Sequence, residues 1–223
     1  FAIFTICITV GVQAQELPKG LAANERDANF LQSIGVEGNP YQNKTAQATI
    51  HTTPPSFNVR TMAEWEEIEA LTITWSTDYG ITEEIILTQI VEYAINECDI
   101  IIICDNQNTV AGYLASQGIS SPNIHYIEAD YNNIWMRDYG QNTVYKNYVE
   151  DRFLVDWIYN RNRPYDDLVP EHIATHLNID MYNTTQPPYD LMATGGNFMS
   201  DGMGTAFSSK LIEDENSGGY AWN

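Results

Sequence analysis

The stretch from Asn133 to Gly140 places an aromatic ring, a guanidinium and a carboxylate within four positions, at Trp135, Arg137 and Asp138. A buried carboxylate that its neighbours do not fully neutralise is costly unless a cation completes it, so Asp138 would suit a cationic ligand. The alternative is that Arg137 and Asp138 belong to separate structural ion pairs. In a regular strand Trp135 and Asp138 would face opposite sides, so a shared pocket requires a bend or bulge between them.

A second group with chemical potential is the pair Arg161 and Arg163, which are two of only 10 basic residues and precede Pro164. Two guanidinium forks can each donate parallel hydrogen bonds to a carboxylate, so the pair could grip an anionic group. The alternative is that Asp166 and Asp167 neutralise both arginines locally. The spacing alone leaves these two interpretations open.

The third group is Gly195, Gly196 and Asn197, where two glycines allow a backbone approach that a Cβ would block. Shortly afterwards, Asp201 and Gly202 form a typical hairpin-turn pair, so we expect two short strands joined tightly.

Cysteine and histidine supply little recognisable chemistry. Cys98 and Cys104 are expected to be small buried side chains, because no histidine is close in sequence to form a thiolate. His172 and His176 would share one helical face, but a metal site needs a third ligand and the sequence is not His-Glu-x-x-His. We therefore expect no metal and no cofactor.

The elements that must position these residues alternate between strands and helices, which predicts an α/β fold. A helix with Thr82 as its cap should bury Ile86, Ile90, Val91, Ala94 and Ile95 on one face. The remaining predictions are strands over 69–75, 99–104, 123–128, 142–148 and 152–159, a further short strand before Pro187, and helices over 109–117 and 167–178.

The charge balance is strongly acidic, with 30 acidic residues against 10 basic ones and a formal net charge of -20. This argues against nucleic acid or anionic membrane surfaces as partners and favours the approach of cationic ligands. Solubility is an equally simple reason for such a surface. With 43% hydrophobic residues, the 223-residue chain can also bury a sizeable core.

The N-terminus indicates export. The run from Phe1 to Val12 is almost wholly apolar and Val12-Gln13-Ala14 is a small-residue cleavage pattern, so residues 1–14 read as the remnant of a secretory signal peptide. Residues 15–57 are polar and read as a tail or propeptide-like segment, and residues 58–223 as the domain. No later run reaches the roughly 18 apolar residues needed to span a bilayer. We expect a secreted or cell-envelope protein.

Taken together, Trp135-x-Arg137-Asp138-x-Gly140 and the later Gly195-Gly196-Asn197 resemble the guanidine-modifying superfamily that includes agmatine deiminases. The intervening stretch 158–167, Ile-Tyr-Asn-Arg-Asn-Arg-Pro-Tyr-Asp-Asp, is similar to the bacterial, Porphyromonas-type peptidylarginine deiminases. The resemblance covers about residues 58–216. It implies a five-bladed α/β propeller that converts arginine to citrulline and ammonia through a covalent cysteine thiouronium intermediate.

Carried over to this chain, the resemblance makes Asp138 a catalytic-site carboxylate that holds the substrate guanidinium, with Trp135 packed along the arginine side chain. Arg161 and Arg163 would receive the carboxylate of a C-terminal arginine. Gly195, Gly196 and Asn197 would line the pocket. Arginine-containing peptides or proteins are the expected substrates.

The resemblance also implies a His-x-Asp pair and a nucleophilic cysteine, and no histidine or cysteine of this sequence matches those positions. We therefore expect about half of a catalytic domain, a partial propeller that is inactive alone. Two other functions stay open: a small-molecule deiminase acting on agmatine, and a non-catalytic acidic module that binds cationic peptides.

Overall fold

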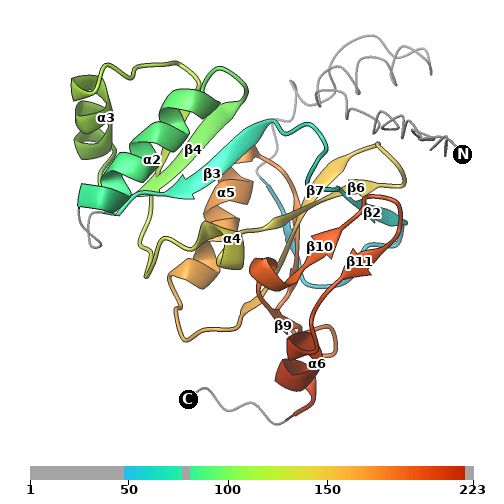
Figure 1. Cartoon of the computed structure of the whole chain (residues 1–223). Coiled ribbons are helices and arrows are strands. Elements are labelled where there is room, and N and C mark those ends of the chain that lie inside the picture. Colours follow the sequence, from blue (N-terminus) through green and yellow to red (C-terminus); the bar gives the residue numbers. More distant parts are fainter. Residues whose placement is uncertain (1–47, 77–80, 219–223) are drawn as a thin grey trace, which may run out of the picture.

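The computed structural model describes residues 48–76 and 81–218, and within them the chain forms two main sheets and a small hairpin (Figure 1). The first sheet is parallel and has the order β3-β4-β5. Its strands are β3 (Ala70–Thr74), β4 (Asp99–Cys104) and β5 (Ile124–Glu128). The expected α/β class is confirmed.

The second sheet is mixed and has the order β1-β8-β7-β6-β2, with β9 also paired to β7. Its strands are β1 (Ile50–His51), β2 (Val59–Thr61), β6 (Asn142–Lys146), β7 (Arg152–Tyr159), β8 (Met181–Thr184) and β9 (Met192–Ala193). The antiparallel hairpin consists of β10 (Met199–Ser200) and β11 (Ala206–Phe207), and the expected turn at Asp201–Gly202 lies between them.

Strand β4 contacts both hydrophobic cores of the chain, because both of its faces are buried. Ile100, Ile102 and Cys104 point into one cluster, with residues of α2 (Ile81–Ala94) and α3 (Gln107–Ser116). Ile101 and Ile103 point into another, with residues of α5 (Val169–Leu177) and the second sheet. Side chains alternate along a strand, so an unbroken apolar run serves two cores at once.

Helix α2 differs in detail from the prediction. Val91 is fully buried, and Ile90, Ala94 and Ile95 are partly buried against the same cluster, but Ile86 is 53% exposed. Leu87 is buried in its place, because Leu87 and Val91 are four residues apart and face the sheet together. Thr82, the expected cap, lies inside the helix, which already includes Ile81, and its side chain is outside the described part of the chain.

The ends of three other elements differ from the predicted ones because of local contacts and backbone conformation. Helix α3 begins two residues earlier than expected, because the side chain of Asn106 caps it by accepting the Thr109 amide at 3.1 Å. Strand β6 ends at Lys146, since Asn147 has a positive φ of 52° in the following turn. The predicted helix over 167–178 is a 3₁₀ turn, η2 (Asp166–Leu168), followed by α5.

The segment expected to be a tail contributes to the second sheet at its end. Strand β1 runs parallel to β8, and the Thr49 amide donates to Oδ1 of Asp180 at 2.9 Å. Phe57 packs on Phe153, with 5.3 Å between the ring centroids. The expected signal remnant, residues 1–14, lies outside the described residues.

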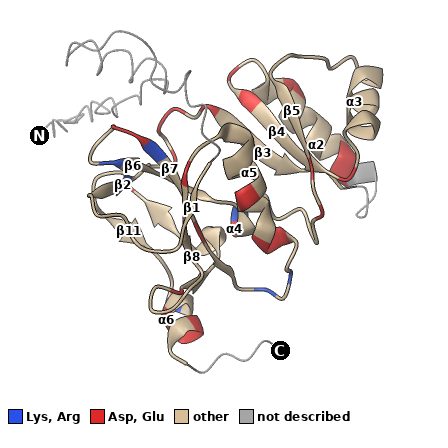
Figure 2. Cartoon of the chain, turned by 180° about the vertical axis from the view of Figure 1, so that it is seen from behind, with Lys and Arg blue, Asp and Glu red and all other residues tan. Residues whose placement is uncertain are grey.

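Acidic positions outnumber basic ones over the ribbon, as the composition requires (Figure 2). Within residues 48–76 and 81–218, none of the helices is long and apolar enough to cross a membrane.

Candidate functional site

The motif around Asp138 forms a single helical turn, α4 (Met136–Tyr139). Trp135 precedes the turn, and its carbonyl accepts the Asp138 amide at 2.8 Å. Residues three apart in a helical turn lie on one side. The bend that a shared pocket requires is therefore present, and Trp135 stands half exposed beside the carboxylate.

Tyr139 anchors this turn to the first sheet. Its side chain is 1% exposed, and its hydroxyl donates to the Asn133 carbonyl at 2.8 Å. The hydroxyl also meets the Thr74 hydroxyl at 2.5 Å, and since its one proton is used, Thr74 is the donor. Burial, the largest cause, raises the pKa of Tyr139, so the phenol stays neutral. These contacts fix the turn that carries Asp138 against strand β3.

Arg137 and Asp138 separate in space. Arg137 forms an exposed ion pair with Glu64, and its Nη2 also lies 3.5 Å from the Phe198 carbonyl. No ion pair among the described residues includes Asp138. The structural ion-pair alternative therefore holds for Arg137 and leaves the Asp138 carboxylate available to a ligand.

The strand pairing of β7 with β9 brings the other two motifs to the same place. The strands are parallel, with Tyr159 opposite Ala193, and the Asn160 amide donates to the Ala193 carbonyl at 3.2 Å. Because parallel strands end at one edge of a sheet, the loops 160–163 and 194–197 leave side by side. The second loop contains η3 (Gly195–Asn197), which packs against α4.

Both glycines are required by close packing on α4. A Cβ at Gly195 would lie closer than 3.0 Å to the Arg137 carbonyl oxygen, and one at Gly196 equally close to Oδ1 of Asp138. The Thr194 hydroxyl donates to the Asp138 carbonyl at 3.3 Å. Gly196 is exposed and therefore forms an open side of the site next to the carboxylate.

Tyr159 lies at the start of the arginine loop and packs against α4, with its ring centroid 5.8 Å from that of Tyr139. It is 3% exposed, and Nη1 of Arg163 lies 3.5 Å from its hydroxyl. Burial raises the pKa of Tyr159, the Arg163 charge lowers it and the Asp138 charge raises it. Arg161 is more exposed, and its Nη1 donates to the Asn160 carbonyl at 3.0 Å.

Asp166 and Asp167 bind backbone amides. Asp166 is fully buried, and its Oδ1 accepts the amides of Asn132 at 2.7 Å and Asn133 at 3.0 Å. Oδ1 of Asp167 accepts the Tyr159 amide at 2.7 Å. Burial is the main cause of the raised pKa of both carboxyls. In the described part of the chain, neither arginine of the loop forms an ion pair with either aspartate, although the Arg163 charge lowers the pKa of Asp166 against the effect of burial.

The side chain of Asn197 contacts the hairpin, whereas Gly195 and Gly196 pack against α4. Its Oδ1 accepts the Ser209 amide at 2.9 Å, which ties the base of the β10–β11 hairpin together. The described contacts of this side chain are therefore with the hairpin rather than with Asp138.

The described contacts bring no thiol or imidazole to Asp138. Cys104 is 1% exposed, and burial raises its pKa to about 11. His125 lies 3.2 Å from Oδ2 of Asp99, and its ring centroid is 5.6 Å from that of His176. In residues 48–76 and 81–218, no group of three or more His, Cys, Asp or Glu side chains is arranged to hold a metal ion.

Sequence reasoning missed Tyr159 and the backbone-binding role of Asp166. Tyr159 was predicted only as the end of an aromatic strand, and its position directly before the arginine loop was the available signal. Nothing in the sequence indicates that the Asp166 carboxylate is directed to Asn132 and Asn133, because that contact spans 34 and 33 positions.

A cavity of about 470 Å³ adjoins α4 and the 195–200 segment. Its lining includes Met136, Arg137, Gly195 and Trp157, but Asp138 is not part of it. We place the candidate site at Asp138 rather than in this cavity, because among the described residues the Asp138 carboxylate and the arginines of the neighbouring 160–163 loop form no ion pair, whereas Arg137 in the cavity is paired with Glu64.

The fold of the chain is similar to those of several solved structures. The chain is similar in structure to an agmatine deiminase from Enterococcus faecalis, with 23% identity and a TM-score of 0.62; the match covers 75% of this chain and 48% of that one. It is also similar to an agmatine deiminase from C. jejuni, with 18% identity and a TM-score of 0.57; that match covers 74% of this chain and 50% of the other. A Porphyromonas gingivalis protein provisionally named an arginine deiminase has 18% identity and a TM-score of 0.59, with 74% and 51% of the two chains covered.

The chain thus spans about half the length of the solved structures that it matches. At these identities the structural likeness shows a shared fold. The family model for Porphyromonas-type peptidyl-arginine deiminases matches residues 60–216, which include α4, the arginine loop and the double glycine. The chain belongs to the Porphyromonas-type peptidyl-arginine deiminase family.

Proposed function

We propose that the chain forms the guanidinium-binding part of a deiminase that converts a C-terminal peptidyl-arginine to citrulline and ammonia. One observation carries the proposal: the pairing of β7 with β9 brings the arginine loop beside the loop whose Gly196 packs against Asp138, and no ion pair among the described residues neutralises Asp138 or the two arginines. A C-terminal arginine has a planar cation at one end and a carboxylate at the other. The site offers the complementary charge for each.

In this proposal each residue has a distinct role. The Asp138 carboxylate accepts hydrogen bonds from the guanidinium, Trp135 packs along the methylenes, and Gly196 leaves room beside the carboxylate. Arg161 and Arg163 donate to the substrate carboxylate. A Cys thiolate attacks the guanidinium carbon, ammonia leaves with a proton from a His, and water hydrolyses the thiouronium.

The thiolate and the His of that scheme come from outside the described residues. Cys104 is unsuited to the role, since its thiol is buried and its pKa is raised to about 11. We therefore propose that the chain as printed binds the substrate without turning it over. The five-bladed propeller, of which this chain would form about half, is part of the same proposal.

Substituting Asp138→Asn tests the binding role, because it removes the charge and keeps the shape. We expect affinity for an arginine-ending peptide to fall by about 10- to 100-fold, the loss of one charged hydrogen bond of roughly 1.5–3 kcal/mol. Exposed Asp130→Asn is the matched control. Equal affinity in Asp138→Asn and wild-type protein would refute the role.

An agmatine deiminase is the second candidate, since two of the structures similar in fold are agmatine deiminases. Agmatine has no carboxylate, so the arginine loop would then have no ligand to grip. The double variant Arg161→Ala, Arg163→Ala separates the two. Loss of preference for the peptide over agmatine supports peptidyl-arginine, and an unchanged preference supports agmatine.

A non-catalytic acidic module would bind cationic peptides and never release ammonia. A His-x-Asp pair and a late Cys encoded after Asn223 would favour the enzyme, and their absence from the gene would favour the module. Ammonia release from an arginine-ending peptide decides directly.

Export is part of the proposal too, supported by the apolar run Phe1–Val12 and the cleavage pattern before Gln15. N-terminal sequencing of the mature protein should begin at Gln15 or later. An N-terminus that retains residues 1–14 would argue against cleavage there.

A further inference from the structure

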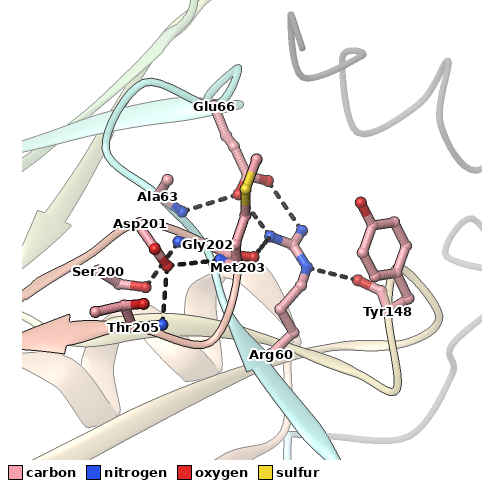
Figure 3. Close-up of polar contacts among 9 residues, drawn as sticks. All are labelled: Arg60, Ala63, Glu66, Tyr148, Ser200, Asp201, Gly202, Met203 and Thr205. Atoms are coloured by element: carbon pink, nitrogen blue, oxygen red, sulfur yellow. Dashed lines mark hydrogen bonds and ion pairs between the residues drawn. The ribbon is translucent and has the colours of Figure 1, made fainter. Parts of the chain in front are cut away.

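Arg60, on β2, is held by more contacts than an ordinary surface arginine. Its Nη1 and Nη2 donate to the two carboxylate oxygens of Glu66 at 2.6 and 2.9 Å. Its Nε donates to the Tyr148 carbonyl at 2.8 Å, and Nη1 also reaches the Gly202 carbonyl at 3.2 Å (Figure 3). The rings of Tyr145 and Tyr148 lie 5.2 and 5.1 Å from the guanidinium carbon. We call Arg60 and Glu66 the clamp.

The clamp is mostly shielded from water. The two side chains are 13% and 11% exposed, and the hydrogen bonds to Glu66 are the largest cause of the raised pKa of Arg60. A bidentate pair at this depth is fixed in geometry and little screened by salt. The guanidinium therefore stays charged and keeps its orientation.

The clamp holds the tip of the β10–β11 hairpin. A Cβ at Gly202 would lie 2.6 Å from Oε1 of Glu66 and 3.1 Å from the Cβ of Ala63, and Gly202 has a φ of +70°. Only glycine fits this approach and this backbone conformation without strain. Oε1 of Glu66 also accepts the Ala63 amide at 2.9 Å, so the carboxylate is held from both sides.

The hairpin tip is itself stiff. Oδ1 of Asp201 accepts the amides of Met203 at 2.8 Å and Thr205 at 2.9 Å, and the Ser200 hydroxyl accepts the Gly202 amide at 3.0 Å (Figure 3). Side-chain acceptors of this kind hold a turn in one backbone conformation. Displacement at the clamp is thus passed along the hairpin rather than absorbed in its turn.

The other end of the hairpin is at the candidate site. The hairpin begins at Met199, directly after Gly196, Asn197 and Phe198, and the bond from the Ser209 amide to Asn197 closes its base. Gly196 touches the Asp138 carboxylate. Thus the chain from 196 to 209 is fixed at its base beside Asp138 and at its tip by Arg60.

We propose that Arg60 is a positioning residue for the guanidinium site: through Glu66 and Gly202 it holds the β10–β11 hairpin, and through the hairpin it holds Gly196 against Asp138. The inference rests on the proposed function for its effect on ligands. Its structural half, the coupling of the clamp to residues 195–197, stands independently of it.

The test uses the chain with Arg60→Met, which keeps the aliphatic stem, and Arg60→Lys, which keeps the charge but loses the bidentate geometry. Arg152→Met is the matched control, since it breaks the partly buried ion pair of Arg152 with Glu69. Amide hydrogen exchange is measured without ligand, and affinity is measured for agmatine and for an arginine-ending peptide.

We expect Arg60→Met to speed amide exchange at residues 195–205 by about tenfold and to weaken both ligands by about five- to tenfold, the range of ordinary coupling between sites. Arg60→Lys should lie between Arg60→Met and wild type. The control should leave 195–205 unchanged. Faster exchange confined to 200–205, with 195–197 as in wild type, would overturn the inference.

The same data separate the two proposals. A wild-type chain that binds neither ligand refutes the proposed function, and the clamp is then judged by exchange alone. Unchanged affinity in Arg60→Met, despite faster exchange at 195–197 and ligand binding by the wild type, would overturn the positioning role while leaving the proposed function intact.

Discussion

Replacing Gly196 by alanine probes the site with a single methyl group. The added Cβ would lie closer than 3.0 Å to Oδ1 of Asp138, whereas ordinary contact begins near 3.4 Å. Its other neighbours, the Asp138 Cγ at 3.7 Å and the Thr194 hydroxyl at 4.0 Å, are at ordinary distances. The clash therefore falls on one carboxylate oxygen, which must move by about 1 Å.

The expected loss of binding follows from that displacement. A guanidinium held by both oxygens of a carboxylate loses one of its two charged hydrogen bonds when Oδ1 turns away, which costs roughly 1.5–3 kcal/mol. Since about 1.4 kcal/mol is a factor of ten, affinity should fall by about 10- to 100-fold.

The effect of Gly196→Ala on stability should be small, because the atom that yields is the end of a side chain. Gly196 has no positive φ, and alanine also reduces the entropy of the unfolded chain. We expect a change within about 1 kcal/mol. Gly195→Ala differs, since its Cβ would meet the backbone carbonyl of Arg137, and forced backbone shifts cost roughly 1–3 kcal/mol.

Calorimetric titration with agmatine and an arginine-ending peptide, together with urea unfolding, measures both quantities. The reasoning predicts lost binding with a stable fold for Gly196→Ala, and lost stability for Gly195→Ala. Wild-type affinity in Gly196→Ala would show that the Asp138 carboxylate is not the ligand contact. Equal destabilisation by both substitutions would show that the two glycines serve packing alone.

Three further predictions concern the scaffold. Tyr139→Phe removes a buried hydroxyl with two partners and should cost about 1–3 kcal/mol of unfolding free energy in urea titrations. Burial, followed by the charge of a neighbouring carboxylate, raises the pKa of Asp156 well above its ordinary value. An acid with a raised folded pKa stabilises the fold most below the unfolded value of about 3.9, and this contribution is lost as pH rises through the folded pKa. Asp156→Asn should therefore flatten the fall in stability between mildly acidic and neutral pH, while exposed Asp130→Asn should leave it in place. Asn106→Ala removes the cap of α3 and should cost about 1 kcal/mol, mainly as faster amide exchange near Thr109.

The sequence predicts the first sheet well because its signals are local. Residues 99–104, with the unbroken apolar run 100–104, become β4 with the expected bounds, and the stretch 152–159, which is rich in aromatic residues, becomes β7. Strands β1 and β2 have two and three residues, and what makes them strands is pairing with β8 and β6 far along the chain. Short strands of this kind leave no periodic signal.

Helix α2 shows that the sequence predicts a helix more readily than the face that it buries. Apolar residues surround much of its circumference, so several faces satisfy a helical period. Whether Ile86 or Leu87 turns inward depends on where the helix contacts β4, and the sequence does not contain that rotation. The candidate site depends on similar information, since the loops that carry Arg163 and Gly196 come side by side only after β7 and β9 pair in parallel.

Asp166 and Asp167, which follow the arginine loop, hold two segments of the candidate site together. The Asp166 carboxylate accepts the backbone amides of Asn132 and Asn133, which precede α4. The Asp167 carboxylate accepts the backbone amide of Tyr159, at the start of the loop. Two neighbouring carboxylates thus tie the segment carrying Asp138 to the loop carrying Arg163.

These ties set the separation between a cation-binding and an anion-binding group, and a fixed separation selects for ligand length. Agmatine can satisfy only one end of such a site, whereas an arginine with a free carboxylate can satisfy both. Asp166→Asn keeps the size of the side chain but weakens its bonds to two amides. It should therefore reduce the preference for an arginine-ending peptide over agmatine more than it reduces agmatine affinity. Equal losses for the two ligands would mean that the tie supports the fold without setting the distance.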